Sequence, residues 1–362
     1  MVATSFQYSH ARGNGALTAV NSLCAERWYK AAMLFFALDQ SKTLGLKVAR
    51  AGGFDLALHE EREFEGGEHK ARPLANVRGQ DVFVLQSLNG EPGKSANDKL
   101  LRLLFFLATC RDHGAARVTA IVPYLAYSRK DRLTKTQDPV TTRYVAQLFE
   151  AIDVDTVMTL EVHNPAAFQN AYRCRTLHLS TEHLFAAEIA GRSTDRPVAI
   201  VSPDPGGVKR AQLLREALQE TTDQDVPFGF MEKRRSAGVV SGTHFAGEVD
   251  DCVVYIVDDM ICGGGTTLRA AEAARAHGAA EVHAIVAHGL LTNDAVTAFA
   301  QTSLVDTITL TDSTAPDPAW AGRLGDRLRS ISCAPMIANA IRQEHDTWPA
   351  QAVAIGPRNA PD

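Results

Sequence analysis

The sequence predicts an α/β protein built from two related domains, each a mostly parallel sheet flanked by helices. The main observation is an internal repeat. Residues 113–122 read HGAARVTAIV and residues 277–286 read HGAAEVHAIV, so that only two of ten positions differ. Each copy reads as a helix end, a glycine C-cap and an apolar strand. The length agrees, because 362 residues suit two domains of about 150 residues better than one core.

The elements before each copy of the repeat also correspond. An apolar strand is predicted at 81–85 before the first copy and at 251–257 before the second. A helix is predicted between strand and repeat, at 98–111 and 267–276. Strand, helix and strand in this order form a βαβ unit, the crossover that a parallel strand pair requires. Continuous apolar strands such as 253–257 indicate sheets that helices cover on both faces.

These elements divide the chain into segments. Residues 1–32 show no clear period and are interpreted as an N-terminal extension. The first domain is expected at 33–179 and the second at 180–330. A helix at about 331–345 is expected to pack back on the first domain, and residues 346–362 are expected to form a frayed tail.

Composition narrows the class of protein. Hydrophobic residues make up 45% and charged residues 22%, the balance of a globular protein, and a net charge of -5 argues against a general nucleic-acid binder. The longest apolar stretch, 31–38, is too short to cross a bilayer, and the N-terminus does not read as a signal peptide. The six cysteines show no CxxC spacing, which fits a reducing compartment. We expect a cytoplasmic protein without a membrane or nucleic-acid partner.

The strongest motif follows the predicted strand at 253–257. In order it contains two acids, a cysteine, three glycines and two threonines: Asp258, Asp259, Cys262, Gly263, Gly264, Gly265, Thr266 and Thr267. Glycines let backbone amides close round a phosphate, and a helix N-terminus adds partial positive charge. Thr266 or Thr267 could cap the helix and donate a hydroxyl to the phosphate. Adjacent acids suit sugar hydroxyls, Mg²⁺ or both; the alternative is a capped turn with solvated acids.

Two weaker motifs also follow predicted strands. Asp204 lies in Ser-Pro-Asp-Pro-Gly-Gly after the strand at 198–201, a sequence that alone is typical of an ordinary turn. His163 follows the strand at 156–160, and a lone histidine is more often structural than a ligand. Glu161 would point the same way in an extended segment, which predicts a His163–Glu161 pair.

Two groups of cations are candidates for binding phosphate. Arg129, Lys130 and Arg132 follow the strand at 118–124. A charge run is usually a solvated face, but this one is placed at the carboxyl edge of a sheet, where ligands bind in α/β folds. Lys233 and Arg235 lead into a stretch of small residues suited to a mobile flap, which in phosphoryl transfer excludes water.

Taken in order, these motifs resemble those of the ribose-phosphate pyrophosphokinases, and the acid–glycine loop is also similar to that of type I phosphoribosyltransferases. Matching segments run from about Phe64 to His345 and cover roughly three quarters of the chain. They include 76–86, 123–132, 161–163, 202–207 and 232–235. The resemblance implies two type I phosphoribosyltransferase-like domains, with ATP on the first and ribose 5-phosphate on the second.

The resemblance also implies an activity: the pyrophosphoryl group of Mg-ATP moves to the 1-hydroxyl of ribose 5-phosphate, giving phosphoribosyl pyrophosphate and AMP for nucleotide biosynthesis. It implies that Lys233 and Arg235 are catalytic, that His163 and Asp204 hold Mg²⁺, and that the chain forms homodimers that build hexamers. ATP would be bound by Phe64 and Glu68, which reach into a neighbouring subunit, and by Arg129, Lys130, Arg132 and His163. Ribose 5-phosphate would be bound by Asp258, Asp259, Cys262, Gly263, Gly264, Gly265, Thr266 and Thr267.

The chain departs from the family pattern at four positions. Cys262 stands where an Asp is common, Gly263 where Thr or Ser is common, Gly66 where an Asp is usual and Lys130 where a Gln is usual. Two alternatives therefore stay open. A non-catalytic regulatory homologue would have no need of the flap cations, and a phosphoribosyltransferase would have neither the second related domain nor ATP dependence.

Overall fold

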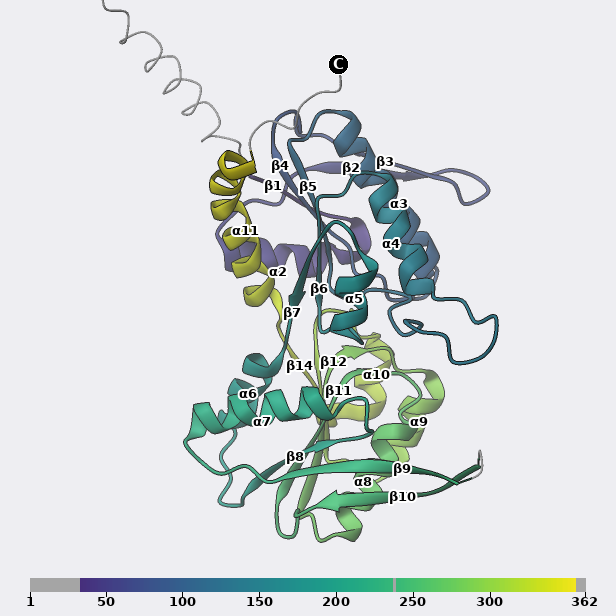
Figure 1. Ribbon diagram of the computed structural model, residues 1–362, viewed down its shortest axis with the longest axis vertical. Helices are drawn as coiled ribbons and strands as arrows, with labels where there is room; N and C mark the ends of the chain where they lie inside the picture. Colours follow the sequence, from purple (N-terminus) through teal and green to yellow (C-terminus); the bar gives the residue numbers. More distant parts are fainter. Residues whose placement is uncertain (1–32, 237–238, 356–362) are drawn as a thin grey trace, which may run out of the picture.

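The computed structural model describes residues 33–236 and 239–355, with side chains left undescribed at 233–243 and 349–355. It consists of two α/β lobes stacked end to end (Figure 1). The expected extension at 1–32 lies outside the described residues. Within them, no helix is both long and apolar enough for a membrane span.

The first lobe is a five-stranded, fully parallel sheet in the order β1-β4-β5-β6-β7. Its strands are β1 (Met33–Ala37), β4 (Asp81–Leu85), β5 (Arg117–Val122), β6 (Thr156–Leu160) and β7 (Arg175–Leu179). Its helices are η1 (Asp39–Ser41), α2 (Lys42–Gly52), α3 (Ala96–Asp112), α4 (Thr141–Ala151) and α5 (Pro165–Ala171). Every residue of β4 is buried, because Val82 and Val84 join the core under α3, α4 and α5 while Phe83 and Leu85 join the core under α2.

The second lobe is a seven-stranded sheet in the order β10-β9-β8-β11-β12-β13-β14, in which only the β9–β10 pair is antiparallel. Its strands are β8 (Val198–Ser202), β9 (Phe228–Ser236), β10 (Val239–Gly247), β11 (Val253–Ile261), β12 (Glu281–Gly289), β13 (Thr307–Thr311) and β14 (Leu328–Ile331). One face packs on α6 (Glu182–Ala190) and α7 (Val208–Thr222). The other face packs on α8 (Gly265–Ala276), α9 (Asn293–Gln301) and α10 (Pro318–Leu324), with η2 (Gly325–Arg327) before β14.

The internal repeat has the same structure in both lobes. His113 and His277 are the C-cap residues of α3 and α8, and in each the Nδ1 of the histidine lies 2.8 Å from the carbonyl oxygen four residues earlier. The glycines that follow, Gly114 and Gly278, have φ of 84° and 89°, the left-handed conformation that favours glycine. The predicted pair of related domains is therefore observed. In sequence, β7 is the last strand of the first sheet and β8 is the first strand of the second.

The C-terminal helix α11 (Ala334–Ile355) returns to the first lobe, as expected, where Ile341 joins the core that contains Val48 of α2. The expected boundaries were wrong, because the helix begins at Ala334 and continues past residue 345 to Ile355. Its later turns have partners on the first lobe. His345 Nδ1 lies 2.7 Å from Asp81 Oδ2, and the guanidinium of Arg117 lies 5.1 Å from the ring centre of Trp348.

A small hairpin, β2 (His59–Glu63) and β3 (His69–Pro73), projects from the first lobe apart from its main sheet (Figure 1). Its turn carries Phe64 and Glu68, joined by a 2.8 Å hydrogen bond from the Phe64 amide to the Glu68 carbonyl. Both residues are exposed.

Buried polar contacts join the lobes near the site. His288 of β12 is 1% exposed and lies with Nε2 3.0 Å from the carbonyl oxygen of Leu160 in the first lobe and with Nδ1 2.8 Å from Ser313 Oγ. Since the carbonyl must accept, Nε2 carries the proton and Nδ1 accepts from the Ser313 hydroxyl. A neutral His288 thus fits this contact.

The contact is expected to lose stability in acid. Burial lowers the pKa of His288 and outweighs the charges of Asp259 and Glu161, which raise it. The unfolded histidine, with a pKa of about 6.5, therefore binds a proton at a pH where the folded one does not. Stability from this group is complete above about pH 6.5 and declines below it. Between about pH 7.5 and 5, the melting temperature of His288→Gln should fall less steeply with decreasing pH than that of the wild type. Parallel curves of melting temperature against pH would contradict this.

Candidate active site

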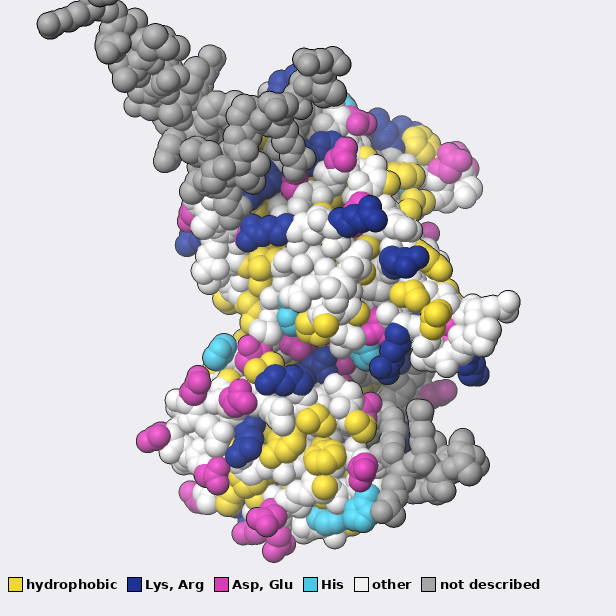
Figure 2. Space-filling model, in the orientation of Figure 1, with side chains coloured by type: hydrophobic (Ala, Val, Ile, Leu, Met, Phe, Trp, Pro, Cys, Tyr) yellow, Lys and Arg dark blue, Asp and Glu magenta, His cyan; other side chains and the backbone are white. Residues whose placement is uncertain are grey.

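A cavity of about 1070 Å³ lies between the lobes, at the carboxyl ends of strands from both sheets. The first lobe contributes 129–132, after β5, and Glu161, His163 and Asn164, after β6. The second contributes 204–207, after β8, and 257–267, from the end of β11 into α8. Figure 2 shows Lys, Arg, Asp, Glu and His side chains gathered at the waist between the lobes. This is the place where α/β folds bind ligands.

The acid pair lies inside strand β11, not after it as predicted. β11 runs to Ile261 because β12 continues beside it, with Asp258 opposite Val286 and Met260 opposite His288. Asp259 is 3% exposed and Asp258 is partly exposed. The Asp259 amide donates to Asp258 Oδ1 at 2.9 Å. Pairing with β12 thus fixes the backbone of both acids at the carboxyl edge of the sheet.

The glycine loop begins helix α8 without a threonine cap, which corrects the prediction. The N-cap is Gly264, with no capping side-chain bond, and Thr266 Oγ1 instead accepts from Arg269 Nη2 at 3.3 Å. Gly264 has φ of 73°, and a Cβ there would lie 2.6 Å from the ring of Phe299. A larger residue does not fit this turn. The predicted cap failed because the chain turns into the helix at Gly264, two residues before the first threonine.

Gly264→Ala is expected to damage both the fold and the loop. A left-handed backbone and a clash with Phe299 together should lower the free energy of unfolding by about 2 kcal/mol. Thermal melts and binding of ribose 5-phosphate measure the two effects. Gly263→Ala is the control for stability, because a Cβ at Gly263 meets no described atom within 4 Å. Equal melting temperatures for the two variants would contradict the role of the Gly264 turn.

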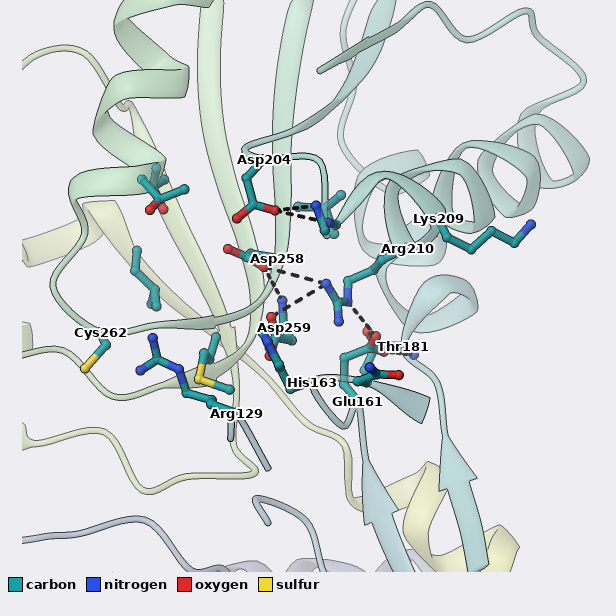
Figure 3. Close-up of a pocket in the computed structure, with 18 of the residues that line it drawn as sticks. Arg129, Glu161, His163, Thr181, Asp204, Lys209, Arg210, Asp258, Asp259 and Cys262 are labelled. Carbon is teal, nitrogen blue, oxygen red and sulfur yellow. Dashed lines mark hydrogen bonds and ion pairs between the residues drawn. The ribbon is translucent and has the colours of Figure 1, made fainter. Parts of the chain in front are cut away.

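His163 pairs with Asp259 of the other lobe, not with Glu161 as predicted. His163 Nδ1 lies 2.9 Å from Asp259 Oδ2 (Figure 3). Glu161 has φ of 40°, so the segment is not extended and its side chain turns elsewhere. The alternation rule failed because it assumes a continuous strand.

Sequence reasoning missed Arg210, which lies at the centre of the acids. Its Nε donates to Glu161 Oε1 at 2.8 Å, and its Nη1 lies 3.6 Å from Asp258 Oδ1 and 3.6 Å from Asp259 Oδ1 (Figure 3). Its position in the sequence could have indicated this role, because Arg210 lies in the first turn of α7, directly after the turn that contains Asp204. Three carboxylates from two lobes thus share one guanidinium.

The contacts around Asp258 and Asp259 shift the pKa values of these two acids in opposite directions. Burial alone would raise the pKa of both. For Asp258 the charge of Asp259 adds to burial, and its pKa lies well above the ordinary value. For Asp259 the hydrogen bond from His163 and the charge of Arg210 outweigh burial and hold its pKa below the ordinary value. The bond to Asp259 in turn raises the pKa of His163. The negative charge of the pair therefore lies chiefly on Asp259.

The turn after β8 places Asp204 on the same cavity. Its Oδ1 accepts from the amides of Gly206 at 2.9 Å and Gly207 at 3.1 Å, which hold the carboxylate in one orientation. The cavity thus includes the carboxylates of Asp204, Asp258 and Asp259 together with the His163 imidazole. Carboxylate oxygens are the protein ligands that Mg²⁺ prefers.

The cationic loop also lines the cavity through Arg129, Lys130 and Arg132, the last two separated by Asp131. Arg129 and Arg132 are exposed. The Lys130 ammonium donates to Asp138 Oδ2 at 2.5 Å and to Thr134 Oγ1 at 3.0 Å, so its charge is partly used within its own loop. The two arginines remain better placed to bind a phosphate.

Four predicted residues remain, on two hairpins. Lys233 and Arg235 belong to β9, opposite Thr243 and Val240 of β10, and their side chains lie outside the described residues. The segment predicted as a flap consists of two antiparallel strands, β9 ending at Ser236 and β10 beginning at Val239. Phe64 and Glu68 do not line the cavity of their own chain, and their expected role in a neighbouring subunit stays a prediction.

Fold and site together define a class: a two-domain α/β protein with a charged cavity between the carboxyl edges of two related parallel sheets. Residues 33–152 match the N-terminal domain of ribose phosphate pyrophosphokinase, and residues 240–349 match the phosphoribosyl synthetase-associated domain. The chain belongs to the ribose-phosphate pyrophosphokinase family, and it is an enzyme of that family.

The similarity to known proteins extends over most of the chain. The ribose-phosphate pyrophosphokinase of Granulibacter bethesdensis is 35% identical over 87% of this chain and 97% of its own length. The ribose-phosphate pyrophosphokinase of Caldanaerobacter subterraneus subsp. tengcongensis is 31% identical over 88% of this chain and 96% of its own length. The crystal structure of phosphoribosylpyrophosphate synthetase from Mycobacterium smegmatis covers 87% of this chain and 99% of its own, with a TM-score of 0.78 and 27% identity. The predicted pair of type I phosphoribosyltransferase-like domains is confirmed.

Proposed function

We propose that this enzyme transfers the pyrophosphoryl group of ATP to the 1-hydroxyl of ribose 5-phosphate, giving phosphoribosyl pyrophosphate and AMP. The observation that supports this best is that one cavity is lined by a glycine loop and an acid pair from one lobe and by cations and His163 from the other. Two phosphorylated substrates bound on opposite walls would meet between the lobes. The names of the similar enzymes agree with this reaction.

The second lobe would bind the pentose. The free amides at the start of α8 would take the 5-phosphate, and Asp258 and Asp259 would take ring hydroxyls. Cys262 lines the same cavity, and its thiol points away from the acid pair in Figure 3. The common Asp at that position is therefore replaced without disturbing the Asp258–Asp259 pair.

The first lobe would bind the nucleotide, with Arg129 and Arg132 on the phosphates. The 1-hydroxyl of the pentose then attacks the β-phosphorus, the bond from that phosphorus to the α-phosphate oxygen breaks, and AMP leaves. Lys233 and Arg235, placed on the β9–β10 hairpin, would neutralise the charge that develops. No covalent enzyme intermediate is required, because positioning and charge supply the rate.

The donor set fits the Mg²⁺ that accompanies ATP. Asp204 offers a carboxylate that two amides orient, and His163 has Nδ1 engaged by Asp259, which leaves Nε2 as a ligand atom. Asp204 and His163 are the residues that would hold the ion. When bound, it would neutralise phosphate charge and polarise the phosphorus.

Purified protein incubated with Mg²⁺, ATP and ribose 5-phosphate should release AMP and phosphoribosyl pyrophosphate in equal amounts, which chromatography or phosphorus NMR measures. A regulatory homologue would release no AMP while folded and loaded with Mg²⁺. A phosphoribosyltransferase would instead release pyrophosphate from phosphoribosyl pyrophosphate in a base-dependent reaction. Either outcome would overturn the proposal.

A further inference from the structure

Arg210 forms a bridge between the two lobes. It lies on α7 of the second lobe, and its Nε donates to Glu161, directly after β6 in the first lobe, at 2.8 Å. The side chains of Arg210 and Glu161 are 15% and 7% exposed, so water screens the pair little. The same guanidinium faces Asp258 and Asp259 through Nη1.

Glu161 is held on both of its oxygens. While Oε1 accepts from Arg210, Oε2 accepts from the amide and the hydroxyl of Thr181, each at 2.8 Å. Thr181 lies between β7 of the first lobe and α6 of the second, where the chain crosses between the lobes. Glu161 has φ of 40°, a sparsely populated conformation for a residue other than glycine, which persists only where its surroundings hold it. Glu161 therefore connects the crossing segment with Arg210.

The geometry of the contact requires an arginine. The Nε edge of the guanidinium faces the first lobe, and Nη1 faces the acid pair of the second lobe. A single ammonium on a lysine is a point charge and does not present two separated donors in a fixed plane. The neighbouring Lys209 extends away from the acids in Figure 3. Arg210 is thus the described cation of α7 that faces all three carboxylates.

We propose that Arg210 is a positioning residue: by joining Glu161 of one lobe to the Asp258–Asp259 pair of the other, it aligns the pentose-binding acids and couples that alignment to the arrangement of the lobes. The proposal rests on the proposed function, because it takes ribose 5-phosphate as the ligand of the acid pair. Without Arg210, the charged Asp259 loses a guanidinium that faces it and Glu161 loses its partner across the cleft. The pentose site would lose order before the nucleotide site does, since the cations of that site lie on the loop after β5.

The test compares binding of each substrate to folded variants of the full chain. Calorimetry measures ribose 5-phosphate and Mg-ATP separately for wild type, Arg210→Gln, Arg210→Lys and Glu161→Gln. Arg210→Gln should weaken ribose 5-phosphate by about tenfold or more, the effect of leaving a buried charged group without its partner. Mg-ATP should change by less than about threefold, and Arg210→Lys should fall between wild type and Arg210→Gln.

Arg215→Gln is the matched control, since Arg215 is on the same helix, pairs with Asp225 of its own lobe and lies outside the cavity. It should leave both affinities unchanged. The double variant Glu161→Gln/Arg210→Gln should bind ribose 5-phosphate no more weakly than Arg210→Gln alone, because the two residues act as one unit. Each melting temperature is measured beside the affinities, so that loss of fold is separated from loss of alignment.

The outcomes are distinct. Wild-type affinity for ribose 5-phosphate in a folded Arg210→Gln overturns the positioning role, as does an equal loss for both substrates or additive effects of the two single changes. Failure of the wild type to bind ribose 5-phosphate at all overturns the proposed function, and the assigned role with it. A selective, non-additive loss in the ribose 5-phosphate affinity supports the role. If Arg210→Gln does not fold, Glu161→Gln and Arg210→Lys carry the same comparison.

Discussion

Lys233→Ala is expected to lower kcat by about 10²- to 10³-fold while changing the dissociation constant of ATP by no more than about threefold. The reason is the timing of the charge. Under the proposed reaction, negative charge moves onto the leaving AMP only as the bond to the β-phosphorus breaks, so a cation on β9 stabilises the transition state more than the bound substrate. Single-turnover kinetics and equilibrium ATP binding measure the two quantities separately.

Lys42→Ala is a suitable control for that experiment. Lys42 is an exposed lysine at the start of α2 and lies outside the cavity, so its loss removes the same charge without touching the site. Its kcat should equal that of the wild type. An unchanged kcat in Lys233→Ala would remove this lysine from the mechanism, and a matched loss in ATP affinity would make it a binding residue only.

Asp259→Asn should lower kcat/KM for ribose 5-phosphate by about a hundredfold, because hydrogen bonds to a charged acceptor are stronger than those to an amide. Asp259 carries most of the charge of its pair, so the isosteric amide removes that charge, replaces one acceptor oxygen with an NH₂ donor and keeps the shape. The amide also loses its ion pair with His163 at 2.9 Å and faces Arg210 without a charge. Steady-state kinetics with varied ribose 5-phosphate measure the effect.

Asp326→Asn provides the comparison, since Asp326 is exposed on η2 and lies outside the cavity. It should keep wild-type kinetics. If Asp259→Asn kept kcat/KM near the wild-type value while its fold was intact, the acid pair would not bind the pentose, and the assignment of the second lobe would fail.

Much of the fold was predictable because it depends on local patterns. The strand at 81–85 was predicted with its observed bounds, since a short apolar run reads as a strand covered on both faces, and all five residues are buried. The repeat was predictable because a helix end, a left-handed glycine and a strand are adjacent in sequence. The end of α11 was not predictable, because its later turns are held by Asp81 and Arg117, which are distant in the chain.

The site was predictable to the extent that its residues follow strands. The acids, glycines, His163, Asp204 and the cations after β5 all line the same cavity. The pairing of these residues was not predictable. His163 meets Asp259 and Glu161 meets Arg210 because the lobes face each other, and no spacing within one segment indicates which side chains meet across a domain boundary.

The central claim is that one cavity holds both substrates with their reacting atoms together. A structure of the protein with Mg²⁺, ribose 5-phosphate and a non-hydrolysable ATP analogue tests this most directly. The account predicts the 5-phosphate at the amides of 263–267, the triphosphate beside Arg129 and His163, and the 1-hydroxyl oxygen about 3–3.5 Å from the β-phosphorus. Substrates bound in separate cavities, or a 1-hydroxyl turned away from the β-phosphorus, would contradict it.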